Sequence, residues 1–513
     1  MKNFKIYISA LALMAFASSC KKSFLDAQPT ETVSTVQEEN ESKNDPQLLD
    51  ARVNGMYTTM YEDFTGDAAN GANQNHDDFG QKGYDIYSDM LSADLLLGAT
   101  NYGWYTGVER YADTKNNTST SDYQPYRYYY RIIFAANNII DLLGGNDATL
   151  SNADSKHYMG QAKAMRAYAY FYLANLYSPL GYGTGNEKIL PILTSATQEE
   201  MPMKTSGEVY DQIIKDLNQA INLLKDFNRP DKAHINADVA RGLLAYTLSA
   251  RGTNDDLTMV TKLTDSILNI SQVPLTTNSQ VVANLDDDGN LTNPESGFNS
   301  LSTSSWMWGA DITLSSNLDL VSWWGQMDIF TYSYAWAGDP KFIDQGLYDA
   351  INEDDVRKGQ FDDNPDYGGL LPTGKFFNAA RVEGGQRNVT DDYIYMRADE
   401  MQLLNAEAYA RLGQDGPART SIHKLTDMRT NNVDLYGIND KSGADLKEAI
   451  YLQSRIELWG EGKTYLAMKR NKHSVTKGSN HLYLKGQTFE YNAPELTFAT
   501  PSGEFLYNPN LTK

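Results

Sequence analysis

The stretch that decides the fold is "AMRAYAYFYLANLYSP", which runs from Ala164 to Pro179. Within it, Ala167, Phe171, Ala174 and Pro179 have the spacing of the second helix of a tetratricopeptide unit. In such a unit the small alanines let neighbouring helices approach, phenylalanine fills the gap between them, and proline ends the helix. The stretch therefore predicts one helix of a helical repeat.

Two partial matches to the same unit occur elsewhere. Ala408 and Ala418 frame one of them, and the segments Leu244–Gly252 and Leu257–Leu268 form the other. Apolar residues recur with a period close to 3.6 in all of these regions, as amphipathic helices require. Long helices are expected at Tyr126–Leu143, His157–Tyr177, Ser206–Leu224, Ala237–Arg251 and Leu257–Leu268.

The predicted fold class is mainly α, a tetratricopeptide-like α-solenoid scaffold with a large loop-rich insertion that contains short strands. The helical repeats are expected at about residues 46–270 and 391–470, and the irregular insertion at about 271–390. Together residues 46–513 are predicted to form a single domain, preceded by a signal peptide at 1–19 and a lipidated cysteine with its tether at 20–45.

The first twenty residues predict the cellular location of the protein. Lys2 and Lys5 precede an apolar run, Ile6–Phe16, that is too short to span a membrane, and small residues lead to Cys20. A small-small-Cys ending is typical of bacterial lipoproteins, whose cysteine is acylated and becomes the first residue. The alternative is a plain signal peptide with an incidental cysteine.

Composition narrows the classes of partner. Cys20 is the single cysteine of 513 residues, so no disulfide is expected. The chain has 44 basic and 66 acidic residues, and removal of residues 1–19 takes away Lys2 and Lys5, which leaves 42 against 66, or −24. This charge argues against nucleic acid and against electrostatic attachment to anionic lipid. The predicted membrane attachment is therefore the lipid on Cys20.

Several segments, in this order, resemble the SusD/RagB family of nutrient-binding outer-membrane lipoproteins. The segments are "FLDAQPTET" at Phe24–Thr32, "FAANNIIDLL" at Phe134–Leu143, "GQAKAMRAYAYFYLANLYSPLG" at Gly160–Gly181, "EVYDQIIKDLNQAINLL" at Glu208–Leu224, "YMRADEMQLLNAEAYARLG" at Tyr395–Gly413 and "SRIELWGEGKTYLAMKR" at Ser454–Arg470. The resemblance covers nearly the whole chain after Cys20.

The resemblance implies a function in nutrient capture. A SusD-like chain binds an oligosaccharide outside the cell and delivers it to a TonB-dependent, SusC-like transporter, whose lid it forms. A peptide is the alternative cargo. The resemblance also implies an outer-membrane protein that is lipid-anchored and faces the cell exterior, with its ligand site on loops of the early helical region and of the insertion.

Aromatic residues supply the candidate ligand site. Flat aromatic rings stack on the C–H faces of sugars, and phenol and indole groups add polar contacts. The candidates are Tyr102, Trp104 and Tyr105 in a Gly-containing loop, Trp323 and Trp324, and Tyr332, Tyr334 and Trp336 in "FTYSYAW". Half-buried core packing is the alternative for the last row, which is expected to place these three rings on one side of a strand.

Two tryptophan pairs lead to opposite expectations. Trp306 and Trp308 would share one face of a strand and are predicted to be buried. Trp323 and Trp324 are adjacent, so an extended chain would point them to opposite faces, and at least one is expected to be exposed or to line a groove.

No cofactor is expected to be required, but one segment matches a calcium loop in part. Oxygen-bearing side chains occupy its alternate positions and one end position, namely Asn284, Asp286, Asp288, Asn290 and Glu295. The alternative is a solvated Asp-Gly turn between two strands.

Enzyme signatures are missing from the sequence. It contains no His-Glu-x-x-His and no nucleophile elbow, and Ser421-x-x-Lys424 lacks the partner motifs of a lactamase. The chain is therefore predicted not to be an enzyme. A lipid-anchored glycosidase remains an alternative, because an acid-rich chain always offers pairs of carboxylates. A scaffold that binds only proteins through its tetratricopeptide-like surface is a further alternative.

Overall fold

The computed structural model describes residues 46–62, 75–198, 200–380, 382–385 and 387–511. The predicted signal peptide, Cys20 and the whole tether lie outside these residues, so those predictions are untested. Residues Arg52–Lys513 form one compact unit. Within the described part of the chain, no helix is both long and apolar enough to cross a membrane.

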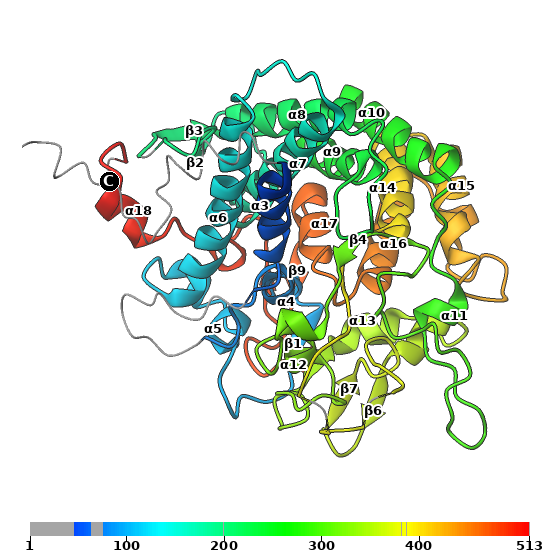
Figure 1. The fold of residues 1–513 in the computed structure, drawn as a ribbon. Coiled ribbons are helices and arrows are strands. Elements are labelled where there is room, and N and C mark those ends of the chain that lie inside the picture. Colours follow the sequence, from blue (N-terminus) through cyan, green and yellow to red (C-terminus); the bar gives the residue numbers. More distant parts are fainter. Residues whose placement is uncertain (1–45, 63–74, 199, 381, 386, 512–513) are drawn as a thin grey trace, which may run out of the picture. The chain divides into compact units, whose positions relative to one another are not determined.

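The helices lie in two groups along the chain, one on either side of a region of short elements (Figure 1). The first group is α3 (Pro46–Thr58), α4 (Gln81–Leu91), α5 (Thr106–Glu109), α6 (Thr120–Leu142), α7 (Ala153–Leu176), α8 (Ser206–Leu223), α9 (Ala237–Arg251) and α10 (Asn254–Asp265). The second is α14 (Ala398–Arg411), α15 (Asp415–Thr426), α16 (Gly443–Glu457) and α17 (Thr464–Asn471). The short helices are α11 (Asn278–Val281), α12 (Trp323–Met327), α13 (Gln345–Ala350) and α18 (Ser502–Tyr507).

The long helices pack as a continuous stack. Each of α6 to α10 contacts the next, α14 then packs on α10, and α15 and α16 pack on α14. Across the α10–α14 contact, the Asn405 side-chain amide donates to the Thr264 hydroxyl at 2.8 Å. The chain thus returns after the insertion to the helix that it left, which confirms the predicted helical scaffold.

Local sequence explains where these helices start and stop. Thr205 and Glu208 form a capping box at the start of α8, and Gly252, with a φ of +73°, ends α9 in the left-handed region. The predicted bounds of α9 are confirmed. The predicted start of α6 at Tyr126 is too late, because the Ser119 side chain caps the helix there and the chain accommodates Pro125 inside it.

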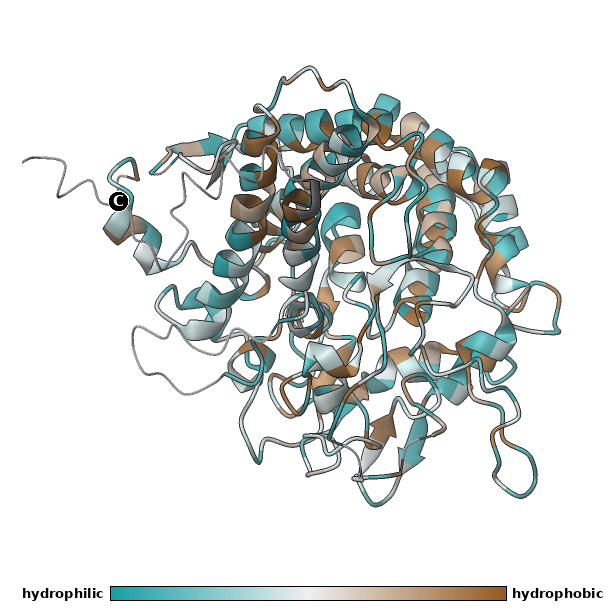
Figure 2. Ribbon diagram, in the orientation of Figure 1, coloured by the Kyte–Doolittle hydropathy of each residue, from teal (hydrophilic) through white to brown (hydrophobic). Residues whose placement is uncertain are grey.

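The outer helices are amphipathic, and the inner ones are buried on all sides. In Figure 2, hydrophilic and hydrophobic residues alternate along the helices of both groups. On α8 only one side is buried, whereas every residue of α7 from Met159 to Leu176 is buried. The apolar positions of the deciding stretch lie in the core: Ala167 and Ala174 are fully buried and Phe171 is 4% exposed. Burial of this face stabilises the stack at about 25 cal/mol per Å² of apolar surface.

The strands are short and form five two-stranded antiparallel sheets in the described residues. The pairs are β1 (Leu95–Leu97) with β5 (Lys341–Ile343), β2 (Lys188–Pro191) with β3 (Met203–Thr205), β4 (Trp306–Ala310) with β8 (Tyr393–Arg397), β6 (Asp362–Asn364) with β7 (Gly369–Leu371), and β9 (Val475–Thr476) with β10 (Thr488–Phe489). The β4–β8 pair joins the two ends of residues 311–392, which make up most of the predicted insertion. Trp306 and Trp308 on β4 are each 1% exposed, so their predicted burial is confirmed.

A buried ionic cluster ties the helices to the insertion. The Glu457 carboxylate on α16 accepts hydrogen bonds from Arg397 at 2.8 Å, from Arg429 at 2.8 and 3.0 Å, and from Arg357 at 3.0 Å. All four side chains are fully buried. The three guanidinium groups hold the pKa of Glu457 well below its usual range even though burial alone raises it. The cluster therefore stays ionised inside the core.

Candidate functional site

A short ladder brings two aromatic loops together. The antiparallel pairing of β1 with β5 places Leu97 opposite Lys341, and the Gly98 amide donates to the Pro340 carbonyl at 2.8 Å. The chain that leaves β1 therefore runs beside the chain that enters β5. The first carries the loop at 98–105 and the second the turn at 328–340.

The Asp339 carboxylate fixes the first loop to the second. It accepts hydrogen bonds from the backbone amides of Asn101 at 2.6 Å and Tyr102 at 2.8 Å. The Asn101 side-chain amide in turn donates to the Gly338 carbonyl at 2.7 Å. Asp339 is 3% exposed, and hydrogen bonds to a buried carboxylate are among the stronger ones in proteins. This contact sets the position of the Tyr102 ring.

The second segment is a turn, not a strand. The Asp328 carboxylate accepts from the amides of Phe330 at 2.9 Å and Thr331 at 2.7 Å, which bends the chain. Tyr332 and Trp336, four residues apart, then lie with their ring centroids 5.3 Å apart and are 40% and 39% exposed. The predicted strand, with Tyr332, Tyr334 and Trp336 on one side, is wrong, because Tyr334 is only 5% exposed.

Tyr334 links the two segments through its ring and its hydroxyl. Its ring meets that of Tyr102 edge-on at 5.1 Å, and its hydroxyl is hydrogen-bonded to Nδ1 of His76. The His76 ring stacks on Trp104 at 5.0 Å with an interplanar angle of 7°. Burial raises the pKa of Tyr334, so its phenol is neutral at physiological pH.

We call the four partly exposed rings Tyr102, Trp104, Tyr332 and Trp336 the aromatic platform. Two neighbouring residues pack against the rings of Tyr332 and Trp336. The guanidinium of Arg387 lies 5.0 Å above the Tyr332 ring. Gly384 packs so closely on Trp336 that a Cβ there would lie 2.4 Å from the indole. Tyr332 and Trp336 are therefore packed against neighbours, while 39–40% of each side chain stays exposed and available to a ligand.

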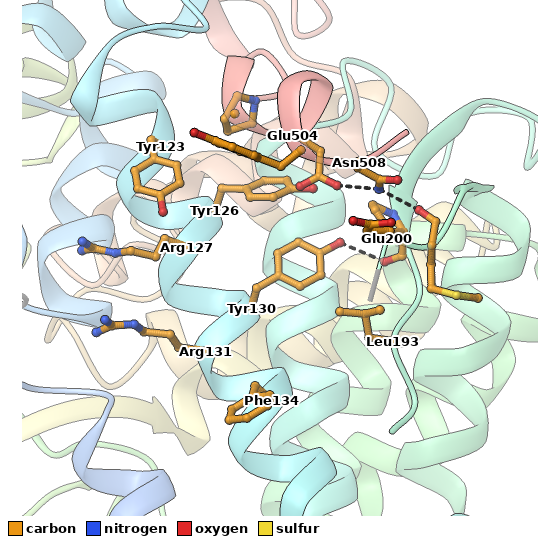
Figure 3. Close-up of a pocket in the computed structure, with 15 residues that line it drawn as sticks. Tyr123, Tyr126, Arg127, Tyr130, Arg131, Phe134, Leu193, Glu200, Glu504 and Asn508 are labelled. Atoms are coloured by element: carbon orange, nitrogen blue, oxygen red, sulfur yellow. Dashed lines mark hydrogen bonds between the residues drawn. The ribbon is translucent and has the colours of Figure 1, made fainter. Parts of the chain in front are cut away.

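A hollow lies along α6. It has a volume of about 640 Å³, within the range of small-ligand sites. Figure 3 shows Tyr126 and Tyr130 projecting from α6 toward Glu504 and Asn508, with Arg127 and Arg131 on the other side of the helix. We call it the α6 groove; its lining residues are Tyr123, Tyr126, Arg127, Tyr130, Arg131, Phe134, Pro191, Leu193, Glu200, Met201, Pro501, Gly503, Glu504, Tyr507 and Asn508.

Two family models match the chain in separate parts. The model described as "Starch-binding associating with outer membrane" matches residues 23–246, and the model described as "SusD family" matches residues 329–505. The chain belongs to the SusD/RagB family. The resemblance found in the sequence is thereby confirmed, and the family descriptions support association with the outer membrane.

Individual relatives of this SusD/RagB chain are distant in sequence. A SusD-like protein of Bacteroides ovatus is 27% identical over 159 residues, 29% of this chain and 28% of that protein. The SusD-like protein P38 of Formosa agariphila is 22% identical over 400 residues, 70% of this chain and 74% of that protein. The chain thus aligns with just over a quarter of the first relative and about three quarters of the second.

Solved structures share the fold. A SusD-like carbohydrate binding protein from Bacteroides vulgatus superposes with a TM-score of 0.73 at 22% identity, over 91% of this chain and 97% of that one. Surface glycan-binding protein A from Bacteroides uniformis superposes with a TM-score of 0.64 at 16% identity, over 91% and 99%. At these identities the likeness shows a common helical architecture.

Not every predicted site residue of the SusD/RagB chain lies on the platform. Tyr105 is 2% exposed. Its ring packs edge-on against the ring of Tyr87, with the centroids 5.4 Å apart, and the Nζ of Lys341 lies 5.5 Å from the centre of the Tyr105 ring. The prediction that Tyr105 faces a ligand is wrong. It is the residue at which the loop enters the core before α5.

Trp323 and Trp324 are also buried, with 2% and 0% exposed. The Ser322 side chain caps α12 by accepting from the Gly325 amide, so the pair lies on a helix and not on an extended chain. Nε1 of Trp324 donates to the Asp391 carbonyl at 2.9 Å. The prediction that one of the two is exposed or lines a groove is wrong, because both rings pack inside the insertion.

The segment with calcium-loop spacing folds as a hairpin turn. Leu285 and Leu291 form a β-bridge, and the Asp286 carboxylate accepts from the amides of Asp288 at 3.0 Å and Asn290 at 2.8 Å. Among the residues that the structure describes, no group of three His, Cys, Asp or Glu side chains is placed to hold a metal ion. The geometry favours the Asp-Gly turn, and calcium binding stays a prediction.

Sequence reasoning missed His76 and Asp339. Both lie far along the chain from the rings that they hold: 258 residues separate His76 from Tyr334, and 237 separate Asp339 from Tyr102. No local pattern marks either residue, because their roles arise from the β1–β5 pairing.

Proposed function

We propose that this protein is a cell-surface lipoprotein that captures an oligosaccharide on the aromatic platform. It delivers the oligosaccharide to a partner TonB-dependent, SusC-like transporter in the outer membrane and acts as the lid of that transporter. Acylation of Cys20 anchors it, and it faces the cell exterior. It performs no catalysis. The peptide cargo is the alternative within the same family.

One observation carries this proposal: two distant loops that are hydrogen-bonded to each other through Asp339 carry four partly exposed rings, and Tyr102, Tyr332 and Trp336 are 39–55% exposed. Large aromatic side chains are mostly buried in folded proteins, so a group of exposed rings whose loops are held by hydrogen bonds is a candidate binding site. Flat rings match the C–H faces of sugars. The family description as starch-binding and the names of the two structural relatives support a glycan over a peptide.

The arrangement of carboxylates supports binding without catalysis. Glycosidases need two carboxyl groups that face the substrate. Asp328 and Asp339, which shape the two loops, are both buried and accept hydrogen bonds from backbone amides. Two carboxylates near the exposed rings have partners as well: Asp319 pairs with Arg387, and Glu383 accepts from the Tyr367 hydroxyl at 2.8 Å.

The test uses residues 21–513 as a purified protein and isothermal titration with neutral oligosaccharides and with peptides. The Trp104→Ala and Trp336→Ala variants are expected to weaken oligosaccharide binding at least tenfold, with no product formed. Unchanged binding in both variants would overturn the platform. Binding of peptides alone would assign the alternative cargo, and release of shorter sugars would establish a glycosidase.

The transporter step has its own experiment. Co-purification of the full-length chain with the barrel protein encoded beside it is expected, and Cys20→Ser is expected to release the chain from the membrane. Failure of the wild-type chain to co-purify would overturn the partnership and leave the glycan site standing.

A further inference from the structure

The α6 groove has one wall of aromatic rings in register. Tyr123, Tyr126, Tyr130 and Phe134 follow one another at spacings of three, four and four, so they lie along one stripe of the helix. At 1.5 Å per residue the stripe is about 16 Å long. Tyr123 is 41% and Phe134 57% exposed, so the two ends of the stripe are open to solvent.

The opposite wall comes from the C-terminal end of the chain. Tyr507 at the end of α18 is 80% exposed. Asn508 fixes this wall, since its side-chain amide donates to the Met201 carbonyl and to the Glu504 carboxylate, both at 2.9 Å. On the α6 side, the Tyr130 hydroxyl donates to the Pro191 carbonyl at 2.8 Å. These bonds, drawn in Figure 3, hold both walls in place.

One polar group in the groove is a buried phenol beside a carboxylate. The Tyr126 side chain is 5% exposed, and its hydroxyl interacts with the side chains of Tyr130 and Glu504. Figure 3 shows this hydroxyl directed toward Glu504 across the groove. Burial and the nearby Glu504 raise its pKa, so the group is a neutral phenol.

The carboxylates of Glu200 and Glu504 lie on the side of the groove that Tyr126 and Tyr130 face. The two arginines of the lining, Arg127 and Arg131, lie on the other side of α6, and Arg127 pairs with Asp78. The groove therefore offers no attraction to an anionic ligand. The groove suits an uncharged ligand with flat apolar faces and hydroxyl groups.

We propose that the α6 groove is a second binding site for a neutral oligosaccharide, separate from the aromatic platform. The inference rests on the proposed function as a glycan-binding protein. The two sites share no residue, because the platform is built from the loops at 98–105 and 328–340. The groove is built from α6, from α18 and its neighbours Pro501 and Asn508, and from Pro191, Leu193, Glu200 and Met201. Sugar rings stack on the stripe of α6, and the Tyr126 hydroxyl and the Glu504 carboxylate bond to the ligand hydroxyls.

The groove contains no tryptophan, and this allows a selective reporter. Trp104 and Trp336 report on the platform, whereas a Tyr507→Trp substitution in a Trp104→Ala/Trp336→Ala background reports on the groove. The probes are maltohexaose, cellohexaose, xylohexaose and laminarihexaose, with hexagalacturonate as the charged counterpart. At least one neutral hexasaccharide is expected to change the fluorescence of the groove reporter saturably, and hexagalacturonate is not.

Titration calorimetry gives the second readout. Tyr507→Ala and Phe134→Ala are exposed substitutions that leave the fold intact, and each is expected to weaken the groove binding event at least tenfold. Leu506→Ala is the matched control, because Leu506 is 71% exposed beside Tyr507 and does not line the groove. Wild-type protein is expected to show two binding events and each single-site variant one.

The outcomes separate this inference from the proposed function. Loss of all binding in the Trp104→Ala/Trp336→Ala variant, with Tyr507→Ala and Phe134→Ala unaffected, would overturn the second site and leave the platform standing. No binding of any hexasaccharide to the wild type would overturn both. Recovery of peptides from a tryptic digest of casein that depends on Tyr507 would assign the groove to a peptide and overturn the inference.

Discussion

The Asp339 carboxylate accepts a hydrogen bond of 2.8 Å from the backbone amide of Tyr102, 237 residues earlier in the chain. The contact joins two loops that meet only because β1 pairs with β5. The buried Asp339 carboxylate thus fixes the backbone that carries the exposed Tyr102 ring, although Asp339 itself does not contact a ligand.

Asp339→Asn is expected to weaken oligosaccharide binding about tenfold, because hydrogen bonds to charged groups contribute about 1.5–3 kcal/mol and the neutral amide keeps only one acceptor. Titration calorimetry measures the binding and urea unfolding the stability. Asp287→Asn, an exposed residue of the 285–291 hairpin, is the control and is expected to change neither. Equal affinity for Asp339→Asn and wild type would show that the contact does not position the platform.

Trp324→Ala is expected to lower the free energy of unfolding by about 3–5 kcal/mol, because it empties the volume of a fully buried indole. Trp336→Ala removes a ring that is 39% exposed and is expected to cost about 1 kcal/mol or less. Urea denaturation of the two variants compares them directly. A similar loss in both would mean that Trp336 belongs to the core.

Glu457→Gln is expected to destabilise the protein by about 3–5 kcal/mol, since it leaves three buried guanidinium groups without their shared carboxylate. Glu448→Gln, on the same helix but exposed, is the control. Thermal unfolding followed by circular dichroism distinguishes them. If the two variants melted together, the cluster would contribute no net stability.

Stability is expected to fall below pH 4.5, in part through Glu407. Burial alone raises the pKa of this carboxyl, but Arg470 and Arg411 lower it from 4.5 to about 2. A depressed folded-state pKa contributes stability that is present above the unfolded pKa and is lost as the pH falls from 4.5 toward 2, here roughly 3 kcal/mol. In urea unfolding at pH 7, 5 and 3, Glu407→Gln is expected to lose stability at pH 7 and to show a shallower decline at acid pH. A decline as steep as that of the wild type would exclude Glu407 as its source.

Removal of calcium is expected to leave the melting temperature unchanged. The Asp286 carboxylate is already engaged by the amides of the hairpin, and these hydrogen bonds lower its pKa. Differential scanning calorimetry with EGTA and with added calcium checks this. A rise of several degrees with calcium that is lost in Asp286→Asn would establish the calcium loop instead.

Much of the helical scaffold was predictable from the sequence, because amphipathic periodicity and caps are local properties. Ala237–Arg251 matches its predicted bounds, since Asn236 caps its start and Gly252 ends it. The β1–β5 ladder was not predictable. Its strands are three residues long and fully buried, so they carry no alternating pattern, and they are separated by more than 240 residues.

The residues of the aromatic platform were predictable only in part, where a local sequence signal marked them. Tyr102 and Trp104 lie in a glycine-containing loop where burial is difficult, and the structure leaves their rings partly exposed. The prediction for Trp323 and Trp324 was wrong because it assumed an extended chain. Ser322, a good helix cap directly before them, was the local signal that the backbone turns there into a helix.

The β4–β8 pair closes residues 311–392 at their base, so that the two ends of a segment of about eighty residues lie side by side on the helical stack. The distance between the two ends is therefore independent of the length of the loops between them. Inside the segment, β5 pairs with β1, and Arg357 bonds to Glu457 on α16. The parts that can vary in length without loss of the scaffold are therefore the loops between these fixed points, among them the turn that carries Tyr332 and Trp336.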